Sequence, residues 1–137
     1  MKSRSKLEVT GGAIFRDGKV LIARRKQGKS LAGFWEFPGG KVELGETPEA
    51  CLKRELREEL GLTVSVVGHL GSASYRYPSF DIELIVLVCV TSEEPTHLEA
   101  HDKYVWSSIA HLSEYSWAPA DLFAVEKLIK EGLPSGL

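Results

Sequence analysis

The sequence has few cysteines and no large excess of either charge. Cys51 and Cys89 are its two thiols. They are too few for a disulfide framework, so we expect each to be a small buried hydrophobic residue in a reducing compartment. Lysine and arginine total 17 and aspartate and glutamate total 19, which gives a net charge of −2. This near balance provides no long-range attraction to a nucleic-acid polymer or to an anionic membrane.

Long apolar segments are also missing. The longest apolar run, Leu84 to Val90, is far too short to span a membrane. The first residues, MKSRSK, are basic, but no long apolar segment follows them, so no signal peptide is expected. No repeat, low-complexity tract or linker divides the 137 residues. We therefore expect one cytoplasmic domain over 1–137, a monomer or homodimer, with a small molecule as its partner.

Short β-rich segments alternate with turn signals along the chain. Asp17-Gly18 separates two of these segments and is a strong hairpin signal. The segment 80–90 begins with alternating residues and then becomes apolar throughout, which is typical of a strand buried on both faces. Strands are expected at 7–15, 19–24, 35–37, 64–77, 80–90 and 103–106.

Two helices are expected. Thr47 can cap a helix, Pro48 suits its first turn, and Gly61 suits the left-handed position after its end, which predicts a helix over about 48–60. A second helix is expected over about 119–131. The stripes expected to be buried are Leu52, Leu56 and Leu60 in the first helix and Leu122, Val125, Leu128 and Ile129 in the second. Helices interspersed among more numerous strands indicate a mixed α/β or α+β sandwich.

The first helix has an acidic face. Glu55, Glu58 and Glu59 stand at i, i+3 and i+4, so their carboxylates gather within about one turn. Like charges at this spacing destabilise an isolated helix by a few tenths of a kcal/mol per pair. A solvated acidic face would tolerate that cost. A carboxylate cluster also suits Mg²⁺, a hard cation that takes further oxygens from substrate phosphates.

Two neighbouring features sharpen this hypothesis. Arg54 lies at i−4 from Glu58, where it can orient a carboxylate or form a plain helix salt bridge. Upstream, the segment PGGKVELGE offers backbone groups without side chains, together with Lys41. Its glycines could simply form a turn, but a bare backbone beside an acidic patch also lets phosphates approach closely.

The spacing of these residues resembles the Nudix box without a departure. From Gly40, five residues lead to Glu46 and seven more lead to Arg54, where RELREELGL completes the motif. The Nudix family implies an α+β fold, an α/β/α sandwich whose mixed sheet carries the box helix and a C-terminal helix. Its members hydrolyse nucleoside diphosphates linked to a variable group.

The resemblance implies a role for each matching residue. Gly40 matches the glycine whose carbonyl can join a catalytic Mg²⁺, for which Mn²⁺ can substitute. Glu46 matches the earlier box glutamate, which supports the metal shell, and Arg54 matches the arginine that holds a glutamate in place. A bound metal neutralises phosphate oxygens and lowers the pKa of a water molecule. The metal-binding glutamates of the box correspond to Glu55, Glu58 and Glu59.

Outside the box, the segments LIARRK, WEFPGGKVELGETPE and APAD are similar to the MutT-like branch of the family. In that branch, water attacks the β-phosphorus of a nucleoside triphosphate and leaves a nucleoside monophosphate and pyrophosphate. Arg25 and Lys41 match positions that can meet the phosphates. Glu99 resembles a late acid that assists metal binding or accepts a proton from the water. Taken singly, all three residues could instead be surface charges.

At the position expected to contact the nucleobase, this chain differs from some members of the MutT-like branch. Members that remove oxidised guanine nucleotides carry an asparagine where this chain has Asp121. The segment SWAPADL is more similar to members acting on CTP and on oxidised or modified dNTPs, although Asp121 could also merely cap the last helix. Phe37, Tyr77 and Phe80 could stack on a base or belong to the core.

The sequence thus predicts a Mg²⁺-dependent pyrophosphohydrolase for CTP, dCTP or modified dNTPs such as 8-oxo-dGTP. Two alternatives remain open. One is a Nudix hydrolase of a dinucleotide such as ADP-ribose or NADH. The other is a nucleotide-binding sensor without catalysis, although such proteins usually lose box glutamates and this chain keeps them.

Overall fold

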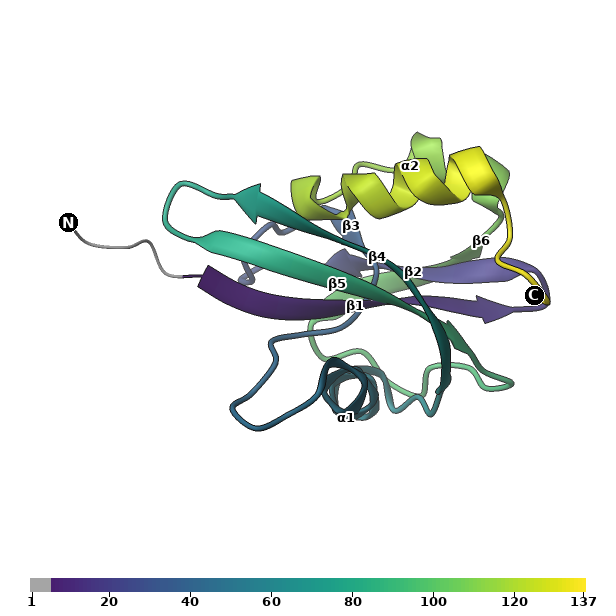
Figure 1. Ribbon diagram of the computed structural model, residues 1–137, viewed down its shortest axis with the longest axis horizontal. Coiled ribbons are helices and arrows are strands. Elements are labelled where there is room, and N and C mark those ends of the chain that lie inside the picture. The colour runs from purple at the N-terminus through teal and green to yellow at the C-terminus, as the bar shows by residue number, and fades with distance from the viewer. Residues whose placement is uncertain (1–5) are drawn as a thin grey trace.

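A six-stranded sheet lies between two helices in the computed structural model, which describes residues 6–137. Residues 1–5, most of the basic start considered for a signal peptide, lie outside the described residues. Helix α1 (Pro48–Leu60) lies below the sheet and α2 (Leu122–Glu131) above it (Figure 1). The strands are β1 (Lys6–Arg16), β2 (Lys19–Arg25), β3 (Trp35–Glu36), β4 (Ser65–Arg76), β5 (Asp81–Val90) and β6 (His101–Ser107).

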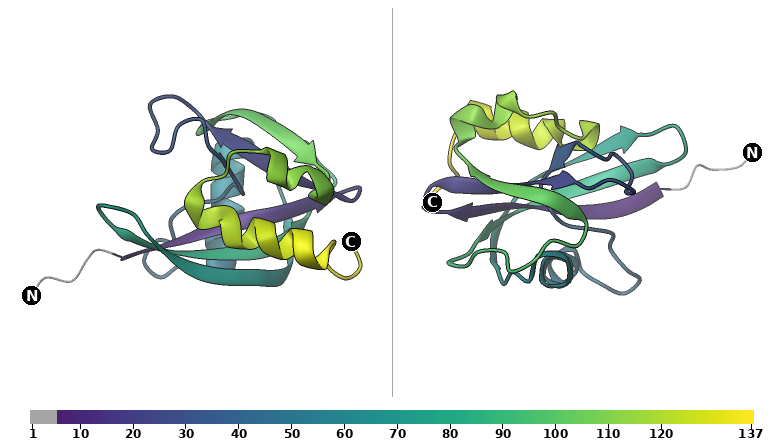
Figure 2. Two further views of the ribbon diagram at one scale, coloured as in Figure 1. Left: turned by 90° about the horizontal axis from the view of Figure 1, so that it is seen from above. Right: turned by 180° about the vertical axis from the view of Figure 1, so that it is seen from behind.

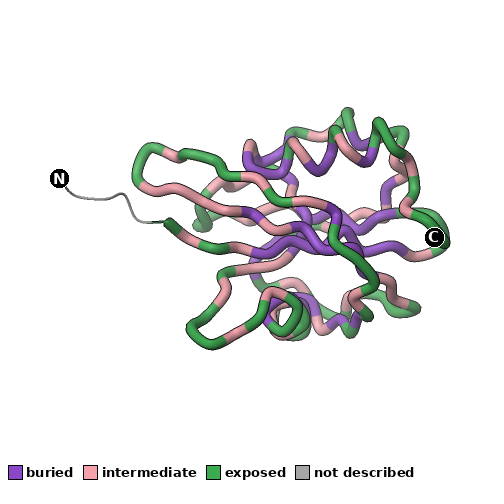
Figure 3. The backbone as a smooth tube through the Cα atoms, in the orientation of Figure 1, coloured by how far each residue is buried: buried purple, intermediate pink, exposed green. Residues whose placement is uncertain are grey.

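The sheet is mixed, as expected. Its order is β3-β2-β1-β5-β4, and β6 pairs with β2. β1 and β5 run parallel, from the pair Lys6 and Asp81 to the pair Phe15 and Val90, and the other strand pairs are antiparallel. The continuous apolar part of β5 is buried over residues 86–89, in agreement with the prediction of burial on both faces. Figure 3 shows this burial concentrated in the central strands.

The β1–β2 hairpin has the turn that its sequence predicts. Asp17 and Gly18 both have positive φ, at 51° and 76°, and Arg16 pairs with Lys19 across the turn. Two positive φ values are the property of a two-residue type I′ turn, whose twist matches that of the strands it joins. The Asp-Gly prediction is confirmed.

Helix α1 begins and ends where its capping residues predict. The Thr47 hydroxyl oxygen accepts a hydrogen bond from the Ala50 N–H at 3.1 Å. Gly61 follows the helix in the left-handed conformation, with φ of 58°, and its N–H donates to the Arg57 carbonyl at 3.0 Å. Capping at both ends satisfies backbone groups that a helix terminus leaves without partners. Within residues 6–137, no helix is both long enough and apolar enough to cross a membrane.

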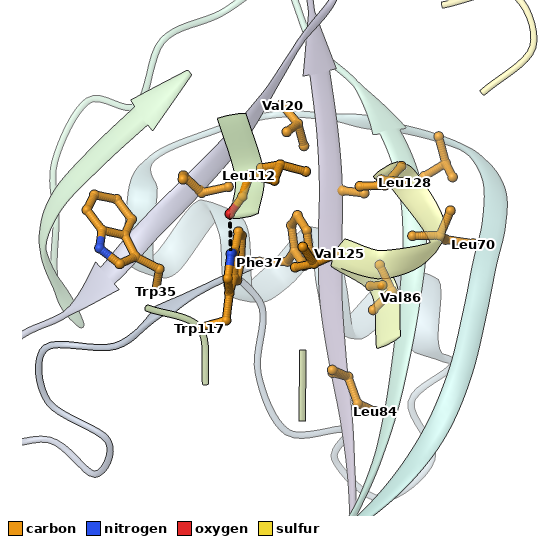
Figure 4. Packing of buried hydrophobic residues seen from close by; sticks show 14 of the residues in the cluster. Val20, Trp35, Phe37, Leu70, Leu84, Val86, Leu112, Trp117, Val125 and Leu128 are labelled. Carbon is orange, nitrogen blue, oxygen red and sulfur yellow. Dashed lines mark hydrogen bonds between the residues drawn. The ribbon is translucent and has the colours of Figure 1, made fainter. Parts of the chain in front are cut away.

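The sheet separates two hydrophobic cores. Ile14, Leu21 and Leu87 pack with the leucine stripe of α1, and both cysteines are buried free thiols, Cys89 within this core. Alternate strand residues face the other side, where α2 covers them (Figure 2). In that second core, the Trp117 indole N–H donates to the Leu112 carbonyl at 2.7 Å (Figure 4).

The last helix differs from its prediction. Residues Pro119–Asp121 form a 3₁₀ turn, and the α-helix begins only at Leu122. The expected buried face is only half correct, since Leu122 and Ile129 are 43% and 46% exposed. The buried residues of α2 are Ala124, Val125 and Leu128, so the small Ala124 belongs to the buried face and the larger Leu122 and Ile129 lie at its edges. A further 3₁₀ segment, Ile109–Glu114, was not predicted.

The two C-terminal apolar residues of α2 give a matched test of this burial. Leu128→Ala should lower the free energy of unfolding by about 2–5 kcal/mol, because it removes a buried side chain and leaves a cavity. Ile129→Ala should change it by no more than about 0.5 kcal/mol, since that side chain is half exposed. Urea unfolding followed by circular dichroism measures both. Equal losses would contradict this orientation of α2.

Candidate active site

A cleft of about 600 Å³ opens beside the acidic face of α1. Its walls come from β1, the end of β2, the segment 36–41, α1 and the turn between β4 and β5. The expected site residues that line it are Arg25, Phe37, Gly40, Lys41, Glu55, Glu59, Tyr77 and Phe80. Five further expected site residues do not line this cleft: Glu46, Arg54, Glu58, Glu99 and Asp121.

The glycines of the box loop allow two close approaches. A Cβ atom at Gly39 would overlap the Thr10 carbonyl of β1, and one at Gly40 would overlap the Glu55 carboxyl group. The loop is bonded to β1, since the Thr10 N–H donates to the Gly40 carbonyl at 2.8 Å. The Thr10 hydroxyl also donates to this carbonyl, at 3.2 Å. The oxygen that the family resemblance assigns to the metal therefore already accepts hydrogen bonds from β1.

Arg54 joins the box loop to the acidic face of α1. Its Nε and Nη2 donate to the two carboxylate oxygens of Glu46 at 2.7 and 2.9 Å. Its Nη1 donates to Glu55 at 2.9 Å and to Glu58 at 3.2 Å. Arg54 Nη2 also donates to the Lys41 carbonyl at 3.3 Å. One guanidinium group thus holds the loop and two helix carboxylates in a fixed arrangement.

Hydrogen bonds to Glu46 stabilise its charged form. The Arg54 guanidinium, followed by the backbone N–H of Glu43, lowers the pKa of the Glu46 carboxyl to about 2. The same contact raises the pKa of Arg54. Although it does not line the cleft, Glu46 is therefore an anion that orients Arg54 over the ordinary pH range.

Glu59 has the opposite environment. Burial, followed by the nearby charges of Glu55 and Glu36, raises the pKa of the Glu59 carboxyl to about 8. A divalent cation between Glu55 and Glu59 would offset this repulsion, and carboxylate oxygens are the ligands that Mg²⁺ prefers. Among residues 6–137, no three acidic, histidine or cysteine side chains converge as a ready-made ligand set. Arg54 bonds Oε1 of Glu55 and Oε2 of Glu58, so a cation held by these carboxylates would bind mainly through their other oxygens.

Asp121 lies buried behind the cleft. Its Oδ2 accepts a hydrogen bond from the Phe37 N–H at 2.9 Å. Burial, followed by the charge of Glu36, raises the pKa of the Asp121 carboxyl well above its usual range. Within the described chain, its side chain makes no capping hydrogen bond to α2, so the alternative of a simple helix cap has no contact to support it.

The expected aromatic residues occupy different positions. Phe37 is 2% exposed and its ring lies 4.9 Å from that of Trp117, so it is a core residue that also contributes to the cleft wall. Tyr77 and Phe80 are half-buried in the β4–β5 turn, with ring centroids 5.5 Å apart. The Tyr77 hydroxyl accepts from the Ala120 N–H at 3.4 Å. The turn thus presents a pair of rings to the cleft.

Glu99 lies in an exposed loop that is docked on the end of α1. Its backbone N–H donates to the Glu59 carbonyl at 3.1 Å, and the Thr96 N–H donates to the Leu60 carbonyl at 2.8 Å. The Glu99 side chain is exposed. The structure therefore brings its backbone to the acidic helix, and its catalytic role stays a prediction.

Sequence reasoning missed one charged residue of the cleft and the buried histidine that contacts it. Glu36 lines it, and the buried His101 contacts Glu36 with 2.8 Å between His101 Nε2 and Glu36 Oε2. Glu36 could have been noticed from sequence, because it is a charged residue between two large aromatic residues, Trp35 and Phe37, and a carboxylate in such surroundings needs a polar partner. No local pattern distinguished His101.

Comparison with known proteins identifies the family of the chain. The family model described as NUDIX domain matches residues 6–132. The chain belongs to the Nudix family. Among curated Nudix relatives, "CTP pyrophosphohydrolase" of Escherichia coli is 37% identical over 120 residues, covering 88% of this chain and 89% of that protein. "8-oxo-dGTP diphosphatase" of E. coli is 34% identical over 125 residues, covering 90% and 96%.

Two solved structures agree with the fold. The solution structure of the E. coli ORF135 protein has a TM-score of 0.77 and 34% identity, covering 96% of both chains. The MutT Nudix hydrolase from Burkholderia pseudomallei has a TM-score of 0.80 and 28% identity, covering 91% of this chain and 99% of that one. This chain is accordingly a Nudix hydrolase with an α+β, MutT-like fold.

The Glu46 carboxylate should make the stability of this Nudix domain depend on pH. Because its folded pKa is lowered from 4.5 to about 2, its contribution is fully present above pH 4.5 and is lost as the pH falls towards 2. Glu46→Gln should therefore lower the Tm at pH 7, and its difference from wild type should shrink between pH 4.5 and 2.

Differential scanning calorimetry across pH 2–7 measures this difference. Glu43→Gln is the matched control, since the exposed Glu43 lies 3.8 Å from Arg54 and should show little effect. A Glu46→Gln deficit that did not vary with pH would contradict the assignment.

Proposed function

We propose that this Nudix hydrolase is a Mg²⁺-dependent nucleoside triphosphate pyrophosphohydrolase that releases a nucleoside monophosphate and pyrophosphate. The supporting observation is a single cleft with three kinds of wall. Glu55 and Glu59 lie on one side, the cations Arg25 and Lys41 border them, and an aromatic pair closes the β4–β5 side. A volume of about 600 Å³ suits a small ligand of nucleotide size.

Each group has a distinct task in this proposal. Arg25 and Lys41 bind the phosphates, and the carboxylates of Glu55, Glu58 and Glu59 hold Mg²⁺ or Mn²⁺. When bound, the metal neutralises phosphate oxygens and lowers the pKa of a water molecule, which supplies the nucleophile. Arg54, held by Glu46, keeps the carboxylates of Glu55 and Glu58 in orientation, and such supporting contacts typically matter 10–100-fold for metal affinity.

The proposed substrates are CTP, dCTP, or oxidised and modified dNTPs such as 8-oxo-dGTP. The curated relatives bear the names of a CTP pyrophosphohydrolase and an 8-oxo-dGTP diphosphatase. Asp121 helps to select the base in this proposal. A protonated carboxyl can both donate and accept a hydrogen bond, and burial favours that form here. Tyr77 and Phe80 stack on the base, and the protein acts in the cytoplasm as a monomer or homodimer.

Two other functions remain as alternatives. A dinucleotide hydrolase would need a cleft for a second nucleoside, and an ADP-ribose pyrophosphatase shares the fold at only 17% identity. A non-catalytic sensor is disfavoured because Glu55, Glu58 and Glu59 are all present.

The products test the proposed reaction. With Mg²⁺ in ¹⁸O-labelled water, attack at the β-phosphorus should place the label in pyrophosphate, with unlabelled monophosphate as the other product. Mass spectrometry of reactions with CTP, dCTP, 5-methyl-dCTP, 8-oxo-dGTP, dGTP and ADP-ribose measures both the label and the preferred substrate. Label in orthophosphate, or turnover of ADP-ribose alone, would refute the proposal.

Glu58 tests the metal assignment. Glu58→Gln removes one charged ligand while its exposed position spares the fold, so kcat should fall by roughly 10²–10³. The matched control is Glu126→Gln on the exposed face of α2, which should keep wild-type turnover. Near-normal turnover of Glu58→Gln at saturating Mg²⁺ would show that Glu58 is not a ligand.

A further inference from the structure

A β-bulge places His101 beside Arg25. Lys103 pairs with Arg24 and His101 pairs with Arg25, so Asp102 is the extra residue between the two pairs. Asp102 turns to Arg24, whose Nε donates to its Oδ1 at 2.8 Å. Because directly opposed residues of paired strands share a face, His101 lies on the same face as Arg25. Because of the bulge, the adjacent residues His101 and Asp102 contact different partners, Glu36 and Arg24.

The buried His101 ring is bonded to Glu36. The His101 side chain is 0% exposed, and its Nε2 lies 2.8 Å from Oε2 of Glu36. An ionised carboxylate can only accept, so Nε2 donates this hydrogen bond. Among the residues that the structure describes, His101 Nδ1 has no hydrogen-bond partner. A buried polar atom without a partner costs free energy, so packing alone would favour an apolar residue here.

Glu36 connects His101 to a cation of the cleft. The same Oε2 of Glu36 lies 3.6 Å from Nη1 of Arg25. On its other side, the Arg25 guanidinium donates to the Ser30 carbonyl at 3.0 Å and to the Ser30 hydroxyl at 3.2 Å. Arg25, Ser30 and Glu36 line the cleft, but His101 does not. Any influence of His101 on a ligand must therefore pass through Glu36.

Two groups hold the Glu36 carboxylate at one oxygen. His101 Nε2 and Arg25 Nη1 both approach Glu36 Oε2, at 2.8 and 3.6 Å. The Glu36 side chain is only 18% exposed, so little water competes for these contacts. Loss of the His101 contact would free the carboxylate to rotate and would weaken its contact with Arg25.

We propose that His101 is a positioning residue that fixes Glu36, and through it Arg25, in the cleft and so sets the affinity for the nucleotide. The identity of this ligand rests on the proposed function. Three observations support the inference: the bulge that places His101 opposite Arg25, the hydrogen bond from His101 Nε2 to Glu36, and the approach of both His101 and Arg25 to the same Glu36 oxygen.

The test compares three substitutions of His101. His101→Leu should raise KM for the preferred triphosphate roughly tenfold, as for the loss of one good hydrogen bond, with kcat within about twofold of wild type. His101→Gln should restore KM to within about threefold, because its amide can still donate to Glu36. If the Leu variant does not fold, His101→Asn serves in its place, since its amide is too short to reach Glu36. The control is His111→Leu, on an exposed segment, which should leave KM unchanged.

A double-mutant cycle shows whether His101 acts through Glu36. In a Glu36→Ala background, His101→Leu should change KM by less than about twofold, whereas a purely structural role would give the same change in both backgrounds. Equal effects in both backgrounds, or a Gln variant as impaired as the Leu variant, would overturn the proposal.

Calorimetric binding of the α,β-methylene analogues of dCTP and dGTP separates this proposal from the proposed function. For the analogue that binds, the Kd values should rank the His101 variants in the same order as the KM values. This measurement does not require turnover. If no triphosphate is hydrolysed but this order holds, the proposed reaction fails and the positioning role stands. An unchanged Kd for His101→Leu refutes the positioning role whatever the reaction.

Discussion

The contact between Arg54 and Glu46 connects two parts of the active site that the chain builds separately. Glu46 belongs to the loop that follows the box glycines, whereas Glu55 and Glu58 belong to α1, and one guanidinium group bonds all three. Without that group, the helix carboxylates would repel one another and the loop would have no charged tie to the helix. A planar guanidinium with five donors can make these contacts at once, which a lysine ammonium on a flexible stem cannot do with the same geometry. The arrangement of the acidic wall depends on this residue.

The structural features predicted correctly from sequence are those determined by residues that are adjacent or close together in the chain. Thr47, Pro48 and Gly61 specify the bounds of α1 through their own backbone preferences and hydrogen bonds, and the structure matches them. The Asp17-Gly18 turn is likewise determined by two adjacent residues. The grouping of acids on one face follows from helical spacing alone. The box spacing adds the identity of the family, which the match over residues 6–132 shows.

The parts not predicted depend on partners that are distant in sequence. The tie between Glu36 and His101 needs three strands and a bulge at Asp102, none of which leaves a local pattern. Asp121 could be placed before the last helix, but its hydrogen bond to the Phe37 N–H depends on how that turn packs against the box loop. The exposed face of α2 was misjudged for a different reason. Apolar residues occupy more of the circumference of α2 than the core covers, and composition alone does not show that Ala124 is buried while Leu122 and Ile129 are exposed.

The parallel pairing of β1 with β5 has a consequence for how the chain acquires its structure during synthesis. Lys6 pairs with Asp81, so β1 must wait for β5 to leave the ribosome, after the box loop and α1 have already been made. Within this interval, the loop can bond to β1 through Thr10 and Gly40, and α1 can form from its own caps. Pairing of residues so far apart in sequence must overcome loop-closure entropy before it forms any contact and is intrinsically slow. The acidic helix and its glycine loop therefore have time to assemble on an incomplete sheet. Pairing of β5 with β1 then completes the centre of the sheet.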